Sequence, residues 1–182
     1  MMRKLKLDEL GRKSEVEYAE TTKAPLRIVL DQIRSGLNVG SFFRSADAFQ
    51  IEHIDLCGIT PQPPHREILK TAIGADRTVQ WSYHRDIAAH LTVLKSEGYH
   101  IIGIEQTDES IRLSEYQIEP DLKYALVFGN EVEGLSESAL PLIDAAIEIR
   151  QWGTKHSLNV SVCAGIVMWH FAQKMKASTN VK

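Results

Sequence analysis

Short runs of apolar, β-branched residues alternate along this chain with segments whose apolar residues recur at helical spacing. The runs that predict buried strands are 26–30, 54–59, 99–105, 124–129 and 145–150. The segments that predict helices are 40–49, 86–98, 136–143 and 157–176. Strands that alternate with helices indicate an α/β fold, with a mostly parallel sheet flanked by helices.

Ligands of open α/β sheets bind outside the carboxyl ends of the strands. Three polar, glycine-containing loops are expected at that edge: 31–40, 129–136 and 150–158. In the third loop, Ser157 is placed to cap the last helix and Asn159 to lie in its first turn. The stretch "KHSLN" holds four polar residues, which is more than one cap needs, so it is a candidate site.

The other two loops allow more than one interpretation. "GNEVEGLS" (129–136) lacks the Lys-Ser/Thr pair of a phosphate loop, which leaves a glycine turn that holds Asn130 and Glu131, or a plain turn with Ser136 as a helix cap. Asn38 could be an ordinary cap. Arg44 stands among apolar residues, and arginine suits phosphate and carboxylate recognition.

Composition narrows the class of protein. The 182 residues are expected to form one main domain at 25–176, with a basic, amphipathic arm at 1–24 and a basic tail at 177–182. No apolar run reaches the roughly 20 residues of a membrane span, and the N-terminus lacks a secretory signal, so we expect a cytoplasmic protein without membrane contact. The two cysteines predict no disulfide, and the seven histidines form no recognisable ligand pair, so no metal is expected.

Charge is distributed unevenly. Residues 1–44 hold nine Lys/Arg against six Asp/Glu, although the net charge of the chain is −3. A basic arm and tail on an acidic body could form a cationic face for nucleic acid, or could simply be solvated ends.

Three stretches together resemble a known family. "NVGSFFRSADAF", "LVFGNEVEGLS" and "IRQWGTKHSLNVSVCAGI" are similar, in order and spacing, to the three signature motifs of the SpoU (TrmH-type) branch of the SPOUT RNA methyltransferases. The resemblance covers roughly residues 25–175. "EGYHIIGIEQTDESIRLSEY" also resembles members that 2′-O-methylate a guanosine of the tRNA D-loop.

The resemblance implies a fold, a cofactor and an assembly. The family fold is a parallel α/β domain with a deep C-terminal trefoil knot, and its members are homodimers that share the active site across the interface. They bind S-adenosylmethionine in the knot, largely through backbone groups. Carried over to this chain, the cofactor-binding positions are Gly129, Ile149, Leu158, Ile104, Glu105, Gln106, Phe128, Asn130 and Ser157. We expect a branched side chain at Gly129 to enter the space of the cofactor.

The resemblance also implies which residues act on the RNA. A ribose 2′-hydroxyl attacks the methyl group directly, without a metal, so positioning carries much of the catalysis. The motif-one residues are Arg44, which activates the hydroxyl, and Asn38, which holds the geometry. Because the pKa of arginine exceeds about 12, we expect Arg44 to grip the adjacent phosphate and polarise the hydroxyl, rather than to act as a base. Glu131 and Asn130 would orient Arg44, and Ser157 and Asn159 complete the catalytic site.

Two departures from the family pattern affect these expectations. Arg150 and Gln151 replace the usual Pro-Met beside the cofactor, and the common N-terminal RNA-binding domain is not expected here.

The function that the resemblance predicts is tRNA 2′-O-methylation. The alternatives are rRNA methylation, or a catalytically silent, knotted RNA-binding protein. A nucleotide-binding module of flavodoxin or dehydrogenase type is disfavoured because no phosphate fingerprint is present.

Overall fold

The computed structural model of the chain describes residues 2–179 and contains a seven-stranded sheet. The strands are β1 (Ala24–Asp31), β2 (Ile51–Cys57), β3 (Gln80–His84), β4 (Tyr99–Ile104), β5 (Ile111–Arg112), β6 (Lys123–Phe128) and β7 (Ala145–Glu148). Their order in the sheet is β3-β2-β1-β6-β4-β7-β5, and all of these neighbours pair in parallel. The predicted parallel α/β architecture is confirmed.

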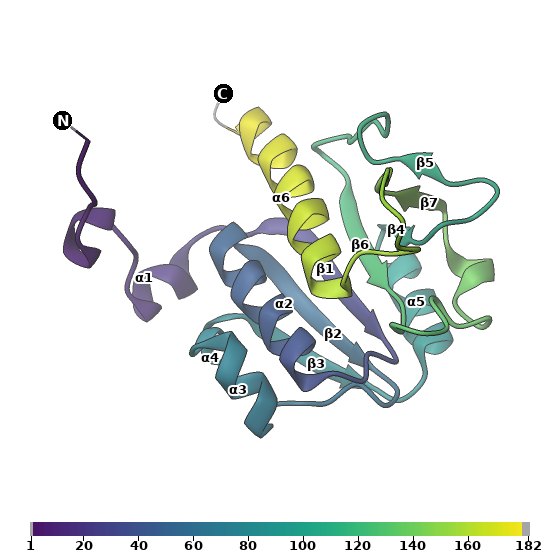
Figure 1. The fold of residues 1–182 in the computed structure, drawn as a ribbon, viewed down its shortest axis with the longest axis horizontal. Helices are drawn as coiled ribbons and strands as arrows, with labels where there is room; N and C mark the ends of the chain where they lie inside the picture. The colour runs from purple at the N-terminus through teal and green to yellow at the C-terminus, as the bar shows by residue number, and fades with distance from the viewer. Residues whose placement is uncertain (1, 180–182) are drawn as a thin grey trace.

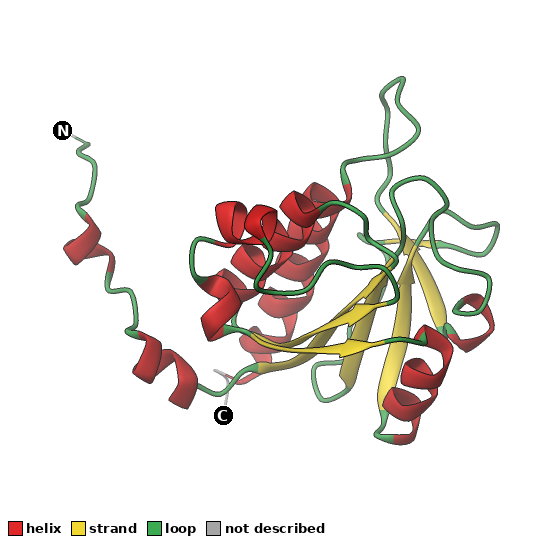
Figure 2. Cartoon of the chain, turned by 90° about the horizontal axis from the view of Figure 1, so that it is seen from below, coloured by secondary structure: helices red, strands yellow, loops and turns green. Residues whose placement is uncertain are grey.

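Helices cover both faces of this sheet (Figures 1 and 2). The α-helices are α1 (Glu15–Glu20), α2 (Gly36–Phe49), α3 (Arg66–Ala72), α4 (Ala75–Thr78), α5 (Ile87–Ser96) and α6 (Val160–Thr179), with 3₁₀ helices at Leu7–Leu10 and Leu140–Leu142. Helices α2 and α6 pack against each other over one face, and α5 packs over the other. Since successive strand residues point to opposite faces, each buried strand contributes to both layers.

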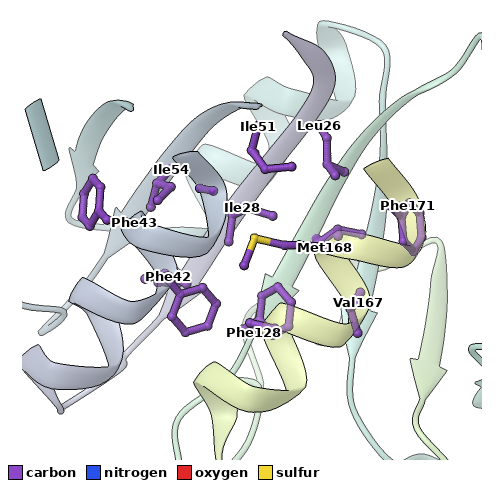
Figure 3. Close-up of a cluster of buried hydrophobic side chains, with 14 of the residues drawn as sticks. Leu26, Ile28, Phe42, Phe43, Ile51, Ile54, Phe128, Val167, Met168 and Phe171 are labelled. Carbon is purple, nitrogen blue, oxygen red and sulfur yellow. The ribbon is translucent and has the colours of Figure 1, made fainter. Parts of the chain in front are cut away.

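The larger core lies between the sheet and the α2–α6 pair (Figure 3). Phe42 of α2 meets Phe128 of β6 edge-on, with ring centroids 5.2 Å apart. Met168 and Phe171 of α6 are fully buried in the same cluster. These contacts hold the first turns of α2 and α6 close to the end of β6, where the candidate loops emerge.

The structure differs from the sequence predictions in two regions. The helix predicted at 136–143 is wrong: only the 3₁₀ helix Leu140–Leu142 forms, and Pro141 within it has no N–H with which to continue a helix. The segment between β2 and α5 carried no prediction, yet it forms α3, α4 and β3. Strand β3 is an edge strand and lacks the apolar run of a buried strand.

The N-terminal arm extends away from the domain in Figure 1, and α1 is its last helix. A reciprocal Ser14–Glu17 capping box begins α1, and its Tyr18 is buried. The boundaries proposed at residues 24 and 176 stay predictions. Helix α6 continues to Thr179, and the rest of the predicted basic tail, 180–182, lies outside the described residues. Among the described helices, none has the length and hydropathy of a membrane span.

Candidate functional site

A cleft of about 500 Å³ opens at the carboxyl ends of β4, β6 and β7; we call it the strand-end cleft. Two of the three predicted loops, 129–136 and 150–158, contribute to its wall. Every position assigned to the cofactor lines it: Ile104, Glu105, Gln106, Phe128, Gly129, Asn130, Ile149, Ser157 and Leu158. The cleft therefore gathers residues that are up to 59 positions apart, from Ile104 to Cys163.

The turn that follows β6 is built by Asn130. Its backbone N–H donates to the Gly134 carbonyl at 2.8 Å, and the Gly134 N–H donates back at 2.9 Å. The buried Asn130 side chain donates to the Gln32 carbonyl at 2.8 Å and accepts from the Val132 N–H at 2.8 Å. Because these bonds use both ends of its amide, Asn130 shapes the turn, and its expected role in orienting Arg44 stays a prediction.

Glycine is required at position 129 for a reason different from the expected one. A Cβ on Gly129 would lie 2.2 Å from the Gly134 carbonyl carbon and 2.3 Å from the Leu135 nitrogen. It would therefore collide with the backbone of the turn. The expectation that a branched side chain there would enter the space of the cofactor is wrong; it would displace the turn instead.

A chain of hydrogen bonds at the edge of the cleft joins the first two predicted loops to Asn159, which directly follows the third. Asn38 donates from Nδ2 to Glu131 Oε1 at 2.9 Å, and Asn159 donates from Nδ2 to Asn38 Oδ1 at 3.2 Å. Glu131 Oε2 also accepts from the Arg34 N–H at 3.3 Å. Burial raises the pKa of Glu131, but the hydrogen bonds from Asn38 and from backbone amides outweigh burial and hold that pKa below its ordinary value. Glu131 thus orients Asn38, and its expected role in orienting Arg44 stays a prediction.

In the polar stretch that precedes α6, the roles of Ser157 and Asn159 differ from the prediction. Asn159 is the cap: its Oδ1 accepts from the Ser161 N–H at 2.9 Å and from the Val162 N–H at 3.3 Å, and α6 begins at Val160. Ser157 does not cap the helix and lines the strand-end cleft. A hydrogen bond also joins this stretch to the loop after β4: Gln106 Nε2 donates to the His156 carbonyl at 3.0 Å.

Arg44 lies apart from the strand-end cleft. Its exposed side chain borders a separate hollow, together with Glu15, Asp47 and Arg77. Ser35 caps α2, which leaves the Asn38 side chain free for Glu131. Within one chain, the structure brings Asn38, Glu131, Ser157 and Asn159 together but leaves Arg44 outside.

Asp31 is a buried acid that the sequence analysis missed. Its Oδ2 accepts from the Ser136 N–H at 2.8 Å and from the Ser136 hydroxyl at 2.6 Å, so it ties the end of β1 to the loop after β6. Ser136 is therefore not a helix cap. The sequence could have identified Asp31, because this aspartate directly follows a buried apolar run and a buried charge needs a partner.

Residues 25–169 match the model of the SpoU rRNA Methylase family. The chain belongs to this family. It is 27% identical over 156 residues to the tRNA (guanosine(18)-2′-O)-methyltransferase of Escherichia coli, covering 86% of this chain and 66% of that protein. It is 32% identical over 151 residues to the 23S rRNA (guanosine-2′-O-)-methyltransferase RlmB of Neisseria meningitidis, covering 81% and 58%. The chain thus spans two thirds or less of the length of these relatives.

Solved SpoU structures share the fold. The A. aeolicus TrmH/SpoU tRNA modifying enzyme superimposes with a TM-score of 0.80 at 22% identity, covering 91% of this chain and 82% of that one. An AdoMet-bound rRNA methyltransferase from Sinorhizobium meliloti superimposes with a TM-score of 0.77 at 21% identity, covering 87% and 60%. Arg150 and Gln151 stand where the third SpoU motif usually has Pro and Met. Gln151 lines the cleft. Arg150 is exposed, and its guanidinium carbon lies 5.6 Å from the centroid of the Trp152 ring.

Proposed function

We propose that this SpoU protein is a cytoplasmic, S-adenosylmethionine-dependent RNA 2′-O-ribose methyltransferase that acts on a D-loop guanosine of tRNA. The observation that carries the proposal is the Glu131–Asn38–Asn159 hydrogen-bond chain at the edge of the strand-end cleft. It joins one polar residue from each of the three signature motifs. The named activity of the Escherichia coli relative supports the choice of a tRNA guanosine.

The strand-end cleft fits S-adenosylmethionine in size and in lining. Its volume of about 500 Å³ lies within the roughly 300–1,000 Å³ of small-molecule sites. Ile104, Ile149 and Leu158 supply apolar surface for an adenine, and the backbone at Phe128 and Gly129 supplies polar groups at a strand end. The Sinorhizobium meliloti relative was solved with this cofactor bound.

When bound, S-adenosylmethionine supplies an electrophilic methyl group on a sulfonium. The residues of the chain position the ribose and help to remove its proton, with no metal at the reaction centre. Asn38, held from both sides by Glu131 and Asn159, fixes the position of the ribose. Arg44 grips the neighbouring RNA phosphate and polarises the 2′-hydroxyl, whose proton leaves to that phosphate.

A homodimer is part of this proposal because Arg44 does not reach the cleft of its own chain. On α6, the exposed Val162, Ile166 and Trp169 follow one another at helical spacing, with exposed fractions of 53%, 41% and 51%. A two-fold contact through this stripe would bury it, and Arg44 would then complete the cleft of the partner subunit. We also propose the family's trefoil knot, because the segment that leads to α6 packs between the β4 and β6 loops.

The test is transfer of a labelled methyl group from S-adenosylmethionine to tRNA transcripts, followed by nucleoside mass spectrometry. We expect one 2′-O-methylguanosine per tRNA, lost when the target guanosine is replaced. The 32% identity to an rRNA enzyme favours 23S rRNA as the second candidate, so a 23S transcript belongs in the same assay. Cofactor binding without transfer to either RNA would leave a silent RNA-binding protein.

A further inference from the structure

An exposed aromatic side chain lies in the loop between β7 and α6. We call residues 149–159 the third-motif loop; it follows β7 and precedes α6 (Figure 1). Trp152 in this loop is 83% exposed, more than any other Trp, Tyr or Phe that the structure describes. Tryptophan is on average a largely buried residue, because its indole has a large apolar surface. The residues around Trp152 indicate what covers it.

Trp152 stands at the rim of the strand-end cleft. Gln151, directly before it, lines the cleft, and so do His156, Ser157 and Leu158 after it. Because consecutive Cα atoms are about 3.8 Å apart, the Trp152 backbone lies that close to a residue of the cleft wall. A nucleobase is attached to C1′ of the ribose, next to the C2′ that carries the reacting hydroxyl. The base of a nucleotide whose ribose enters the cleft must therefore lie near this rim.

The third-motif loop is supported on both sides of Trp152. Ile149 packs against the larger core, and the His156 carbonyl accepts a hydrogen bond from Gln106 Nε2 at 3.0 Å. The backbone that presents the ring is thus held in place before RNA binds. An aromatic side chain on a supported backbone loses little conformational entropy when it binds.

Charge in the third-motif loop suits an RNA strand. The loop contains Arg150 and Lys155, both exposed, and no acidic residue, although the whole chain carries a net charge of −3. The Arg150 guanidinium carbon lies 5.6 Å from the centroid of the Trp152 ring. Proteins that hold single-stranded nucleic acid combine such cations, for the phosphates, with aromatic rings on which the bases stack. Since 83% of Trp152 is exposed, the ring still offers a face to a base.

The proposed dimer contact does not account for Trp152. The stripe assigned to the dimer, Val162, Ile166 and Trp169, follows helical spacing on α6. Trp152 precedes the first residue of α6 by eight positions and lies in irregular backbone, outside that spacing. Its exposure is therefore a feature separate from the stripe.

We propose that Trp152 stacks on the base of the nucleotide whose ribose enters the strand-end cleft, while Arg150 and Lys155 contact the adjoining phosphates. This inference rests on the proposed function and names the residue that holds the target base. Every base has a flat face, so stacking supplies affinity and position more than base identity. The stretch in which Arg150 and Gln151 replace the usual Pro and Met thus gains a role in holding RNA.

The first experiment measures the affinity of the full-length chain for a tRNA transcript, with cofactor calorimetry and sedimentation beside it. Trp152→Ala should weaken RNA binding by about 5- to 150-fold, the range for the loss of one stacked base. Trp152→Phe should keep most of the affinity because its ring still stacks, whereas Trp152→Leu should not. Cofactor affinity and the dimer should stay as in the wild type. Val93→Ala is the matched control, since Val93 is an exposed apolar residue of α5, on the other face of the sheet.

An abasic transcript tests the contact itself. Replacing the target D-loop guanosine by an abasic ribose should weaken wild-type binding about as much as Trp152→Ala does. The two changes together should weaken binding little more than either alone, because both remove the same contact. Independent losses that multiply would show that the ring and this base do not touch, and would overturn the proposal.

Three other results would also overturn it. Trp152→Ala could bind RNA as tightly as the wild type, or Trp152→Leu could bind as tightly as Trp152→Phe, which would indicate apolar burial without stacking. Dissociation of Trp152→Ala into monomers would make Trp152 a subunit contact. Methyl transfer separates this question from the proposed function: RNA binding that depends on Trp152, without transfer, would overturn the function alone. Transfer with unchanged RNA affinity in Trp152→Ala would overturn the stacking alone.

Discussion

Mixing two inactive variants tests whether the active site is shared between subunits. The first variant is Arg44→Ala, which keeps the strand-end cleft intact. The second is Leu158→Asp, which places a carboxylate in the cleft where the adenine is expected. At a cofactor concentration that saturates the wild-type cleft but lies well below the weakened affinity of Leu158→Asp, each variant alone should have little activity, for different reasons. Their mixture should recover activity only if Arg44 serves the cleft of the other subunit.

The magnitudes follow from where these residues lie. Arg44 is exposed, so Arg44→Ala should change the free energy of unfolding by less than about 0.5 kcal/mol. It should leave cofactor binding intact and slow methyl transfer by about 10²- to 10³-fold, the scale of one lost electrostatic contact to the transition state. Arg44→Lys should restore little, because an ammonium cannot reproduce the planar fork of the guanidinium. Leu158 is 36% exposed, so Leu158→Asp should fold and should weaken cofactor binding by at least about tenfold, or 1.4 kcal/mol.

In a randomly exchanged mixture, half of the dimers contain one subunit of each kind, and one of their two sites is complete. Transfer should therefore recover to roughly a quarter of the wild-type rate. The assay is single-turnover methylation of a tRNA transcript after subunit exchange, with calorimetric cofactor affinity for each variant. Leu140→Asp, an exposed leucine outside the cleft, is the control for an added charge. Recovery no greater than that of either variant alone would place Arg44 in its own subunit's site and refute the shared arrangement.

Three further predictions concern individual contacts. Asn159→Ala should lower the free energy of unfolding by about 1 kcal/mol and the melting temperature by roughly 2–4 °C, because the cap of α6 is lost, whereas Ser157→Ala should change neither in a thermal scan. Glu131→Gln should slow single-turnover transfer roughly tenfold, because a charge-assisted hydrogen bond exceeds a neutral one by about 1–1.5 kcal/mol; a wild-type rate would exclude Glu131 from catalysis. Burial raises the pKa of Asp144, but hydrogen bonds from Lys95 and from a backbone amide hold it below its ordinary value. The ionised Asp144 should thus stabilise the fold above about pH 4, and this stabilisation should be lost as the pH falls further. In Asp144→Asn, the melting temperature should therefore depend less on pH below about pH 4 than in the wild type.

The fold could be predicted where burial dominates the local pattern. Strands β1, β4 and β6 lie inside the sheet and read as apolar runs, and their predicted positions match the structure to within two residues. The pattern failed at the edge of the sheet. Strand β3 alternates polar and apolar groups, and β5 has only two residues, so neither carries a buried run. Their positions depend on neighbours that come from elsewhere in the chain.

The candidate site could be predicted as a set of residues but not as a set of contacts. Strand ends converge in any parallel sheet, which is why the cofactor positions all line one cleft. Which side chain meets which depends on loop geometry that no short pattern encodes. Asn130 serves its own turn, Asn159 replaces Ser157 as the cap, and Glu131 reaches Asn38 across 93 residues. The separation of Arg44 from the cleft is likewise a property of the folded helix.

The hydrogen bonds of Asn159 couple the two halves of the candidate site. Its Oδ1 caps α6, while its Nδ2 holds Asn38, which Glu131 fixes from the other side. A ribose that displaces Asn38 therefore acts directly on the cap of α6 and on the turn after β6. The same helix carries the exposed stripe of Val162, Ile166 and Trp169 that we assign to the dimer. In the proposed dimer, RNA binding, cofactor binding and subunit contact would all depend on α6, so a substitution that loosens α6 should weaken all three together.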